Sequence, residues 1–270
     1  MRSVRDGRRQ DRSVHPHHRG VARGLALDLG SSRTRAWVPG RGVVADTAHG
    51  NGEYGHGRPV RRGRIVDPES CGRMLARIAD RALGERREDM VVVLSHPVLA
   101  GPGHRTAARE MLRALGASDV IVLDSARAAA ACAGPEGGGP LLVVDLGAEL
   151  TEVTLLVDGL VRDARLAETG LSDLEPGEPP AAVVRAVLDM VMAMWRQDRH
   201  GALLGALRRG PSLVGGGALD PGVTHRIAVR LGVPVRLLDD PATAVVRGAG
   251  LILGSVLRHA TATALPGRSR

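Results

Sequence analysis

The chain of 270 residues contains no phenylalanine and no lysine, and aromatic residues make up only 1% of it. Single-strand nucleic-acid binders stack bases on aromatic side chains, so this class is not expected. Two cysteines, Cys71 and Cys132, are too few for a disulfide framework and are typical of a reducing cytoplasm. No apolar run reaches the ~18 residues of a membrane-spanning helix. Residues 1–20 are charged and lack the apolar stretch of a signal peptide.

Arginine is what the chain has in excess. All 37 of its permanently cationic side chains are arginines, and with 29 acidic residues the net charge is +8. Half of this excess lies in residues 1–20, which show no apolar periodicity. We therefore predict a disordered basic tail there; a nucleic-acid-binding role would rest on this tail alone. With 43% hydrophobic residues, the rest of the chain can bury a core.

Short apolar runs alternate with helical patterns, which predicts an α/β fold with covered sheets. Helix starts are expected at Asp67-Pro68, Asp220-Pro221 and Asp240-Pro241, because aspartate caps a helix and proline fits its first position. Between Gly159 and Gly215 we expect only a loop and one long helix, 181–199. The strands are expected near residues 24–28, 35–38, 90–94, 120–123, 141–145, 152–157, 160–166, 212–214 and 235–238.

One sequence pattern occurs twice. Asp28 ends an apolar strand, glycine follows two residues later and threonine six residues later; Asp145 repeats this order. The repeat predicts two copies of one unit facing each other across a cleft. The expected division is a tail over 1–20, a first half over 21–135, a second half over 136–256 and a C-terminal tail over 257–270.

A strand followed by aspartate, glycine and hydroxyl residues suits a nucleoside triphosphate. Glycine lets backbone N–H groups approach phosphates, hydroxyls donate to phosphate oxygens, and aspartate holds the waters of Mg²⁺. An ordinary β-turn with a capping aspartate explains the same residues. The predicted nucleotide-binding residues are Asp28, Gly30, Ser31, Ser32, Thr34, Asp145, Gly147, Thr151, Gly215, Gly216 and Gly217, with Asp28 and Asp145 as the metal ligands; no catalytic residue is assigned.

Six segments, in order from about residue 22 to 255, resemble the MreB (rod-shape-determining) family of bacterial actins. They are 24–38, 59–67, 91–97 with 126–134, 142–153, 213–219 and 239–250. The resemblance implies two duplicated actin-like (ribonuclease H-like) halves around a cleft, with ATP and Mg²⁺ as ligands. It also implies partners in the cytoskeleton or envelope assembly, a full-length MreB-like relative among them, and a cytoplasmic location at the inner face of the membrane, with at most peripheral membrane contact.

The second phosphate loop departs from the family's pattern, Asp-x-Gly-Gly-Gly-Thr-Thr-Glu. Ala148 adds a Cβ where backbone must approach phosphate, and Glu149 adds a carboxylate. One like-charge pair at ~4 Å costs on the order of 4 kcal/mol at an effective dielectric of about 20, so we predict a degenerate cleft. The alternatives are that Glu149 points to solvent or replaces a lost base.

Two further departures concern the base and the chain length. In the family, a water-activating glutamate lies seven residues after the proline that ends a strand. The same count from Pro97 leads here to His104, which is interpreted as a solvent-facing residue at a helix start. Little sequence remains for the small insertion subdomains, at 42–59 and 159–215, so both are expected to be reduced or missing. The alternatives to a degenerate cell-shape protein are a working ATP-dependent switch or weak ATPase, and a sugar or acyl kinase of the same superfold.

Overall fold

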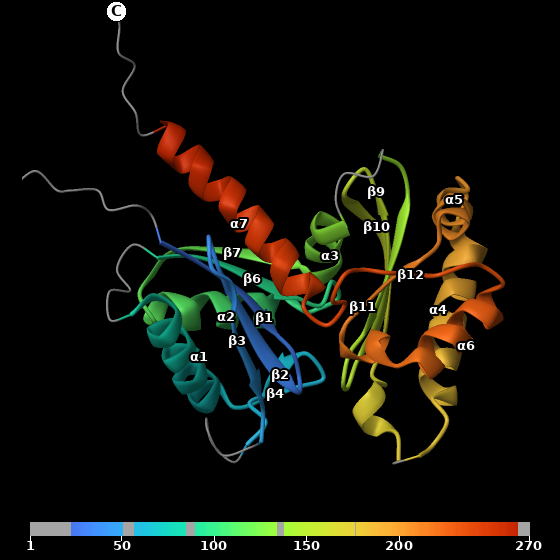
Figure 1. Ribbon diagram of the computed structural model, residues 1–270, viewed down its shortest axis with the longest axis horizontal. Coiled ribbons are helices and arrows are strands. Elements are labelled where there is room, and N and C mark those ends of the chain that lie inside the picture. Colours follow the sequence, from blue (N-terminus) through green and yellow to red (C-terminus); the bar gives the residue numbers. More distant parts are fainter. Residues whose placement is uncertain (1–22, 51–56, 85–89, 134–137, 176, 264–270) are drawn as a thin grey trace, which may run out of the picture.

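The computed structural model describes residues 23–50, 57–84, 90–133, 138–175 and 177–263 as two lobes (Figure 1). Each lobe is built on a five-stranded sheet. The basic tail predicted over residues 1–20 lies outside the described residues. None of the described helices has the length and apolarity that crossing a bilayer requires.

The first sheet has the strand order β3-β2-β1-β6-β7. Its first three strands are antiparallel neighbours, whereas β1, β6 and β7 run parallel. The central strand β1 carries four consecutive buried residues, because both faces of the sheet are covered. The strands are β1 (Arg23–Leu29), β2 (Arg33–Val38), β3 (Gly42–Ala48), β6 (Met90–His96) and β7 (Ala117–Asp124).

The second sheet repeats this topology as β10-β9-β8-β11-β12, again with three antiparallel strands followed by parallel pairing. The predicted duplication is therefore confirmed. The strands are β8 (Leu141–Leu146), β9 (Thr151–Val157), β10 (Leu160–Ala167), β11 (Ser212–Val214) and β12 (Arg236–Leu237).

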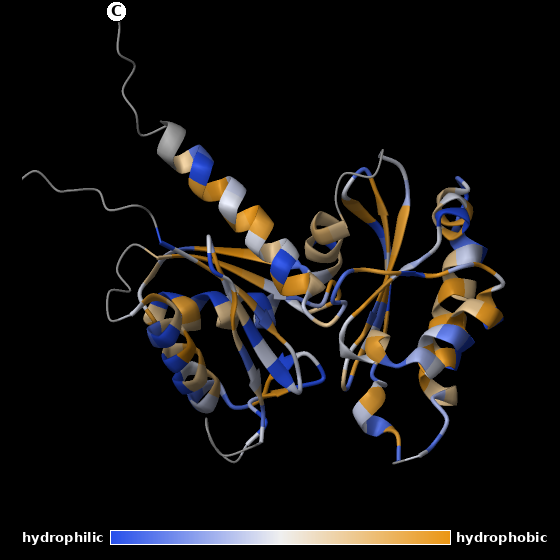
Figure 2. Ribbon diagram, in the orientation of Figure 1, coloured by the Kyte–Doolittle hydropathy of each residue, from blue (hydrophilic) through white to orange (hydrophobic). Residues whose placement is uncertain are grey.

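Helices cover the outer face of each sheet and the space between the sheets (Figure 1), and Figure 2 shows apolar residues in the strands of both sheets. One core lies under α1 and α2, a second under α4, α5 and α6, and a third surrounds α3 and α7 where the lobes meet. The helices are α1 (Pro68–Leu83), α2 (Pro102–Ala114), α3 (Ser125–Ala133), α4 (Ala181–Gln197), α5 (Ala202–Arg209), α6 (Pro221–Leu231) and α7 (Ala244–Thr263), with the 3₁₀ turns η1 (Leu171–Asp173) and η2 (Gly216–Leu219).

Two of the three predicted helix starts are confirmed. Asp67 accepts a hydrogen bond from the Ser70 N–H at 3.0 Å, and Asp220 accepts one from the Gly222 N–H at 2.7 Å. The prediction at Asp240-Pro241 is wrong, because α7 begins at Ala244. Asp240 has a φ of 46°, whereas a capping residue needs extended backbone. The Pro241 carbonyl instead accepts a hydrogen bond from the Gly215 N–H at 2.9 Å.

Several elements were not predicted. The expected single helix before Gly215 is two helices: Asp198 accepts from the N–H of Leu203 at 2.8 Å and starts α5. Strand β3 and the short hairpin of β4 (Val60–Arg61) and β5 (Arg64–Ile65) were also missed. The boundary expected at residue 256 falls inside α7, which packs on β1 and β6 of the first sheet.

Candidate functional site

A cavity of about 280 Å³ lies where the turns of the two duplicated hairpins, β1–β2 and β8–β9, meet. This volume is just below the roughly 300–1,000 Å³ of typical ligand pockets. Of the eleven residues predicted to bind nucleotide, nine line this cavity: Asp28, Gly30, Ser31, Ser32, Asp145, Gly147, Gly215, Gly216 and Gly217. The structure therefore brings segments from both lobes to one place.

The two remaining predicted residues, Thr34 and Thr151, do not line the cavity. Both are fully buried, and both hydroxyls are engaged elsewhere. Thr34 Oγ1 lies 2.9 Å from His49 Nε2, and Thr151 Oγ1 donates to the Thr169 carbonyl at 2.8 Å. Within a strand, side chains alternate between faces, so these threonines lie behind the turns and fix them in place.

The glycines of the two turns have a structural role of their own. The Gly30 N–H donates to the Arg33 carbonyl at 3.0 Å, and the Gly147 N–H donates to the Leu150 carbonyl at 2.8 Å. A Cβ on either glycine would lie within 3 Å of that same carbonyl oxygen. The repeated glycine is therefore required by the shape of the turn itself.

Four carboxylates from the two hairpins line the cavity: Asp28, Asp145, Glu149 and Glu152. Burial raises the pKa of Asp28, and Arg35 partly opposes this. Burial and then the charge of Asp28 raise the pKa of Asp145 to about 7. Burial and then Asp145 raise the pKa of Glu152 to about 7, although Glu152 accepts hydrogen bonds from the Val98 N–H at 2.8 Å and Ser125 Oγ at 3.0 Å.

Arg35 places a permanent positive charge among these carboxylates. Its side chain is 11% exposed, and Nη1 lies 3.9 Å from Asp28 Oδ2. The residues that the structure describes contain no group of three or more His, Cys, Asp or Glu side chains able to hold a metal ion. A divalent cation at the predicted ligands Asp28 and Asp145 would therefore lie in the same cavity as the positive charge of Arg35.

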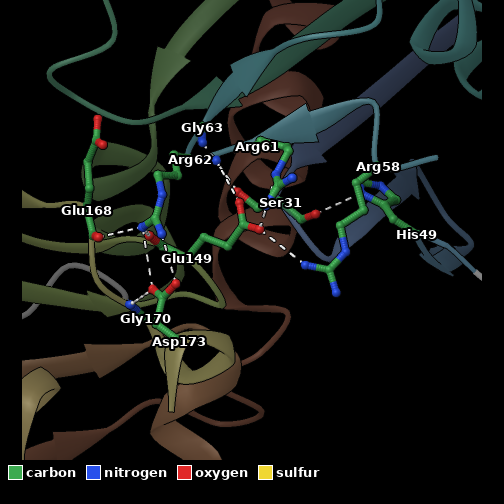
Figure 3. A network of polar contacts seen from close by, with 10 residues as sticks. All are labelled: Ser31, His49, Arg58, Arg61, Arg62, Gly63, Glu149, Glu168, Gly170 and Asp173. Atoms are coloured by element: carbon green, nitrogen blue, oxygen red, sulfur yellow. Dashed lines mark hydrogen bonds and ion pairs between the residues drawn. The ribbon is translucent and has the colours of Figure 1, made fainter. Parts of the chain in front are cut away.

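Glu149 is buried, with 3% of its surface exposed, so the alternative that it points to solvent is wrong. Its carboxylate accepts hydrogen bonds from the Arg62 N–H at 2.8 Å and from Arg58 Nη1 at 3.2 Å, and Arg61 Nε lies 3.8 Å away (Figure 3). The arginines belong to the first lobe and Glu149 to the second. The carboxylate therefore lies at the cavity wall and is held by the opposite lobe.

The Arg62 side chain extends this connection to the segment after β10. Its guanidinium donates to the Glu149 carbonyl at 3.1 Å, to the Glu168 carbonyl and to Asp173 Oδ1 at 2.8 Å. Arg64 adds an ion pair with Glu168 at 3.2 Å. We call this set the interlobe clasp: Arg58, Arg61, Arg62 and Arg64 of the first lobe with Glu149, Glu168 and Asp173 of the second.

Comparison with known proteins agrees with this architecture. The family model described as MreB/Mbl protein matches residues 48–173, which include every member of the clasp. The crystal structure of MreB5 of Spiroplasma citri bound to ADP matches with a TM-score of 0.74 and 17% identity, over 88% of this chain and 98% of that one. The predicted actin-like fold is therefore confirmed by this similarity. The AMPPNP-bound crystal structure of MreB5 of Spiroplasma citri matches with a TM-score of 0.73 and 18% identity, over 92% and 100% of the two chains. Among curated proteins, no sequence matches.

In this MreB-like fold, His104 is half-buried in the first turn of α2 and does not line the cavity. The expectation that it faces solvent is therefore wrong in part. Burial and the nearby charge of Arg105 lower the pKa of His104. His96 lines the cavity instead, with Nδ1 2.6 Å from the Pro97 carbonyl and Nε2 3.6 Å from Asp124.

The sequence interpretation of this chain missed Arg35, Glu152, His96 and the arginines of the clasp. One signal was present for the first two. Asp28 pairs with Arg35 across β1–β2, and Asp145 pairs with Glu152 across β8–β9, at the same spacing in each copy of the repeat. The clasp had no such signal, because its partners Arg62 and Asp173 are 111 residues apart.

The raised pKa of Asp145 predicts a pH dependence of stability. Between the unfolded value of 3.8 and about 7, the folded protein binds more protons at this carboxyl, so its free energy of unfolding falls as pH rises. Asp145→Asn removes the ionisable carboxyl and with it this decrease in the free energy of unfolding. We expect the variant to gain on the order of 2 kcal/mol relative to the unaltered protein between pH 5 and pH 8.

The measurement is urea unfolding of both proteins at several pH values. His49, His96 and His104, whose pKa values burial lowers, contribute the opposite slope, but they cancel in the difference between the two proteins. A difference that does not change with pH would show that Asp145 titrates in the folded state as it does in the unfolded state.

Proposed function

We propose that this chain is an MreB-like cytoskeletal protein whose cleft has lost nucleotide turnover and which acts through protein contacts in cell shape or envelope assembly. Family resemblance supports the cytoskeletal class. The loss of turnover rests on the second phosphate loop. Its partners would be cytoskeletal or envelope-assembly proteins, a full-length MreB-like relative among them, at the cytoplasmic face of the membrane.

The observation that carries this proposal is the position of Glu149. A phosphate entering the cavity meets a carboxylate at its wall, and an uncompensated like-charge contact at ~4 Å costs on the order of 4 kcal/mol at an effective dielectric of about 20. Arg58 and Arg61, both within 4 Å of this carboxylate, offset part of that cost. The side chain cannot rotate away freely, because it is buried and accepts from Arg62 and Arg58.

The backbone of this loop is also fixed. The Ala148 carbonyl accepts from the Ser172 N–H at 2.7 Å, and a Cβ on Gly170 would lie only 2.3 Å from that carbonyl oxygen. The loop is therefore wedged between η1 and the first lobe. A conformational change that admits phosphate has to separate these packed segments as well as the ion pairs.

Calorimetric titration of ATP, with and without Mg²⁺, tests the proposal. We expect no binding in the micromolar range by the unaltered protein. The variant Ala148→Gly, Glu149→Gly removes the carboxylate and the added Cβ and is expected to gain at least roughly a hundredfold in affinity. Micromolar affinity of the unaltered protein would contradict the proposal.

Glu168→Ala is the matched control, because it removes an acidic residue of the clasp that does not line the cavity. Its affinity for ATP is expected to stay at the level of the unaltered protein. If the double variant also fails to bind, the reduced segment between β10 and β11, rather than Glu149, limits binding.

The second candidate is an ATP-dependent switch. It is favoured by the convergence of nine predicted residues on one cavity, and by the ADP and AMPPNP bound to the similar MreB5. In this case the clasp opens when nucleotide enters. The same titration separates the two candidates, since the switch requires the unaltered protein to bind ATP.

A further inference from the structure

The two duplicated hairpins differ in charge at one equivalent position. Asp28 on β1 pairs with Arg35 on β2, and Asp145 on β8 pairs with Glu152 on β9. All four side chains line the same cavity. The two copies of the structural unit therefore share the aspartate. Its cross-strand partner is positively charged in the first copy and negatively charged in the second.

The contacts of Arg35 with the carboxylates around it are long. Nη1 lies 3.9 Å from Asp28 Oδ2, and the buried Nε lies 3.3 Å from Asp46 Oδ1 without making a hydrogen bond to it. Asp46 accepts from the neighbouring Arg33 at 2.6 Å, so it is shared between two cations. The charge of Arg35 also acts on the carboxyls of the cavity, where it lowers the pKa values of Asp28 and Asp145 against the larger effect of burial.

A divalent cation binds where carboxylates and water surround it without a competing positive charge. Arginine stays charged at every pH in which the protein folds, and the Arg35 side chain is largely buried. We propose that Arg35 takes the place of a divalent cation in this cleft, supplying beside Asp28, in the cavity that Asp145 also lines, the positive charge that a metal would supply. The cavity then excludes Mg²⁺ and Mn²⁺ whether or not it admits a nucleotide.

Titration with Mn²⁺ alone, followed by the electron paramagnetic resonance of the free ion, tests this proposal. We expect no binding tighter than about 1 mM by the unaltered protein or by Arg35→Lys, which keeps the charge. The neutral variants Arg35→Met and Arg35→Gln are expected to bind Mn²⁺ at least about tenfold more tightly. Two neutral variants are used so that a failure of one to fold leaves the other.

Two controls locate the effect. Arg33→Met removes the neighbouring cation that also contacts Asp46, and it is expected to gain no Mn²⁺ binding. Adding Asp145→Asn to the neutral Arg35 variant is expected to abolish the gain. Tight binding by the unaltered protein, no gain in either neutral variant, or a gain that survives Asp145→Asn would each overturn the proposal. No nucleotide is present, so the result is independent of the ATP titration.

Discussion

Gly248→Ala is expected to destabilise the protein by about 3 kcal/mol or more, measured by urea unfolding. A Cβ at this position in α7 would lie 1.7 Å from the Ala128 carbonyl oxygen and 2.6 Å from its carbon. Both atoms belong to the backbone of α3, so no side chain can move to make room. The two helices would have to separate, and overpacking of this kind typically costs 1–3 kcal/mol and occasionally more.

The same helix supplies a matched control. At Gly254, the nearest atom to an added Cβ is the end of the flexible Arg258 side chain, at 3.3 Å. Gly254→Ala is therefore expected to stabilise the protein by up to about 1 kcal/mol through helix propensity. If the two variants have equal stability, the contact between α3 and α7 is not the close one described, and the joint between the lobes is looser.

Arg62→Ala is expected to lower the free energy of unfolding and to let the lobes separate. The side chain alone contacts three residues of the second lobe: Glu149, Glu168 and Asp173. About a third of it is exposed, so water replaces part of what is lost, and the effect is smaller than for a fully buried pair. Small-angle scattering is expected to show a larger radius of gyration.

The control is Arg73→Ala, whose partners Glu69 and Ser70 lie on the same helix, α1. This pair is expected to contribute only about 0.3–0.5 kcal/mol, with no change in the radius of gyration. In salt of about 0.5 M, the unaltered protein is expected to show part of the loss of stability and part of the increase in radius of gyration of Arg62→Ala, because ion pairs at the surface are screened. Unchanged scattering in Arg62→Ala would show that the third core alone holds the lobes together.

Local signals predicted the parts of the fold that are decided locally. Asp67 and Asp220 start α1 and α6 because a carboxylate and a proline act within one turn of helix. At Asp240 the same pair of residues failed, since Gly215 holds the Pro241 carbonyl and the backbone of Asp240 turns to positive φ. The tertiary contact overrode the local preference.

The strands and helices that were missed are short or depend on distant partners. The β4–β5 hairpin has two residues in each strand, and Arg62 at its turn has a φ of 45°, which is unfavourable for a residue with a side chain. Contacts with the second lobe hold it in this conformation. No periodicity within six residues can indicate such an element.

The sequence by itself indicated two copies of one unit, through the repeat around Asp28 and Asp145, and an actin-like fold, through its resemblance to the MreB family. It also identified nine residues that meet in one cavity. Only the tertiary structure decided which charges meet there. Arg58 and Glu149 are 91 residues apart, and they pair because both lobes present them at the same edge of the cleft. Hydrophobic periodicity and capping act over a few residues, whereas the balance of charge in a cleft depends on how two separately folded sheets are packed together.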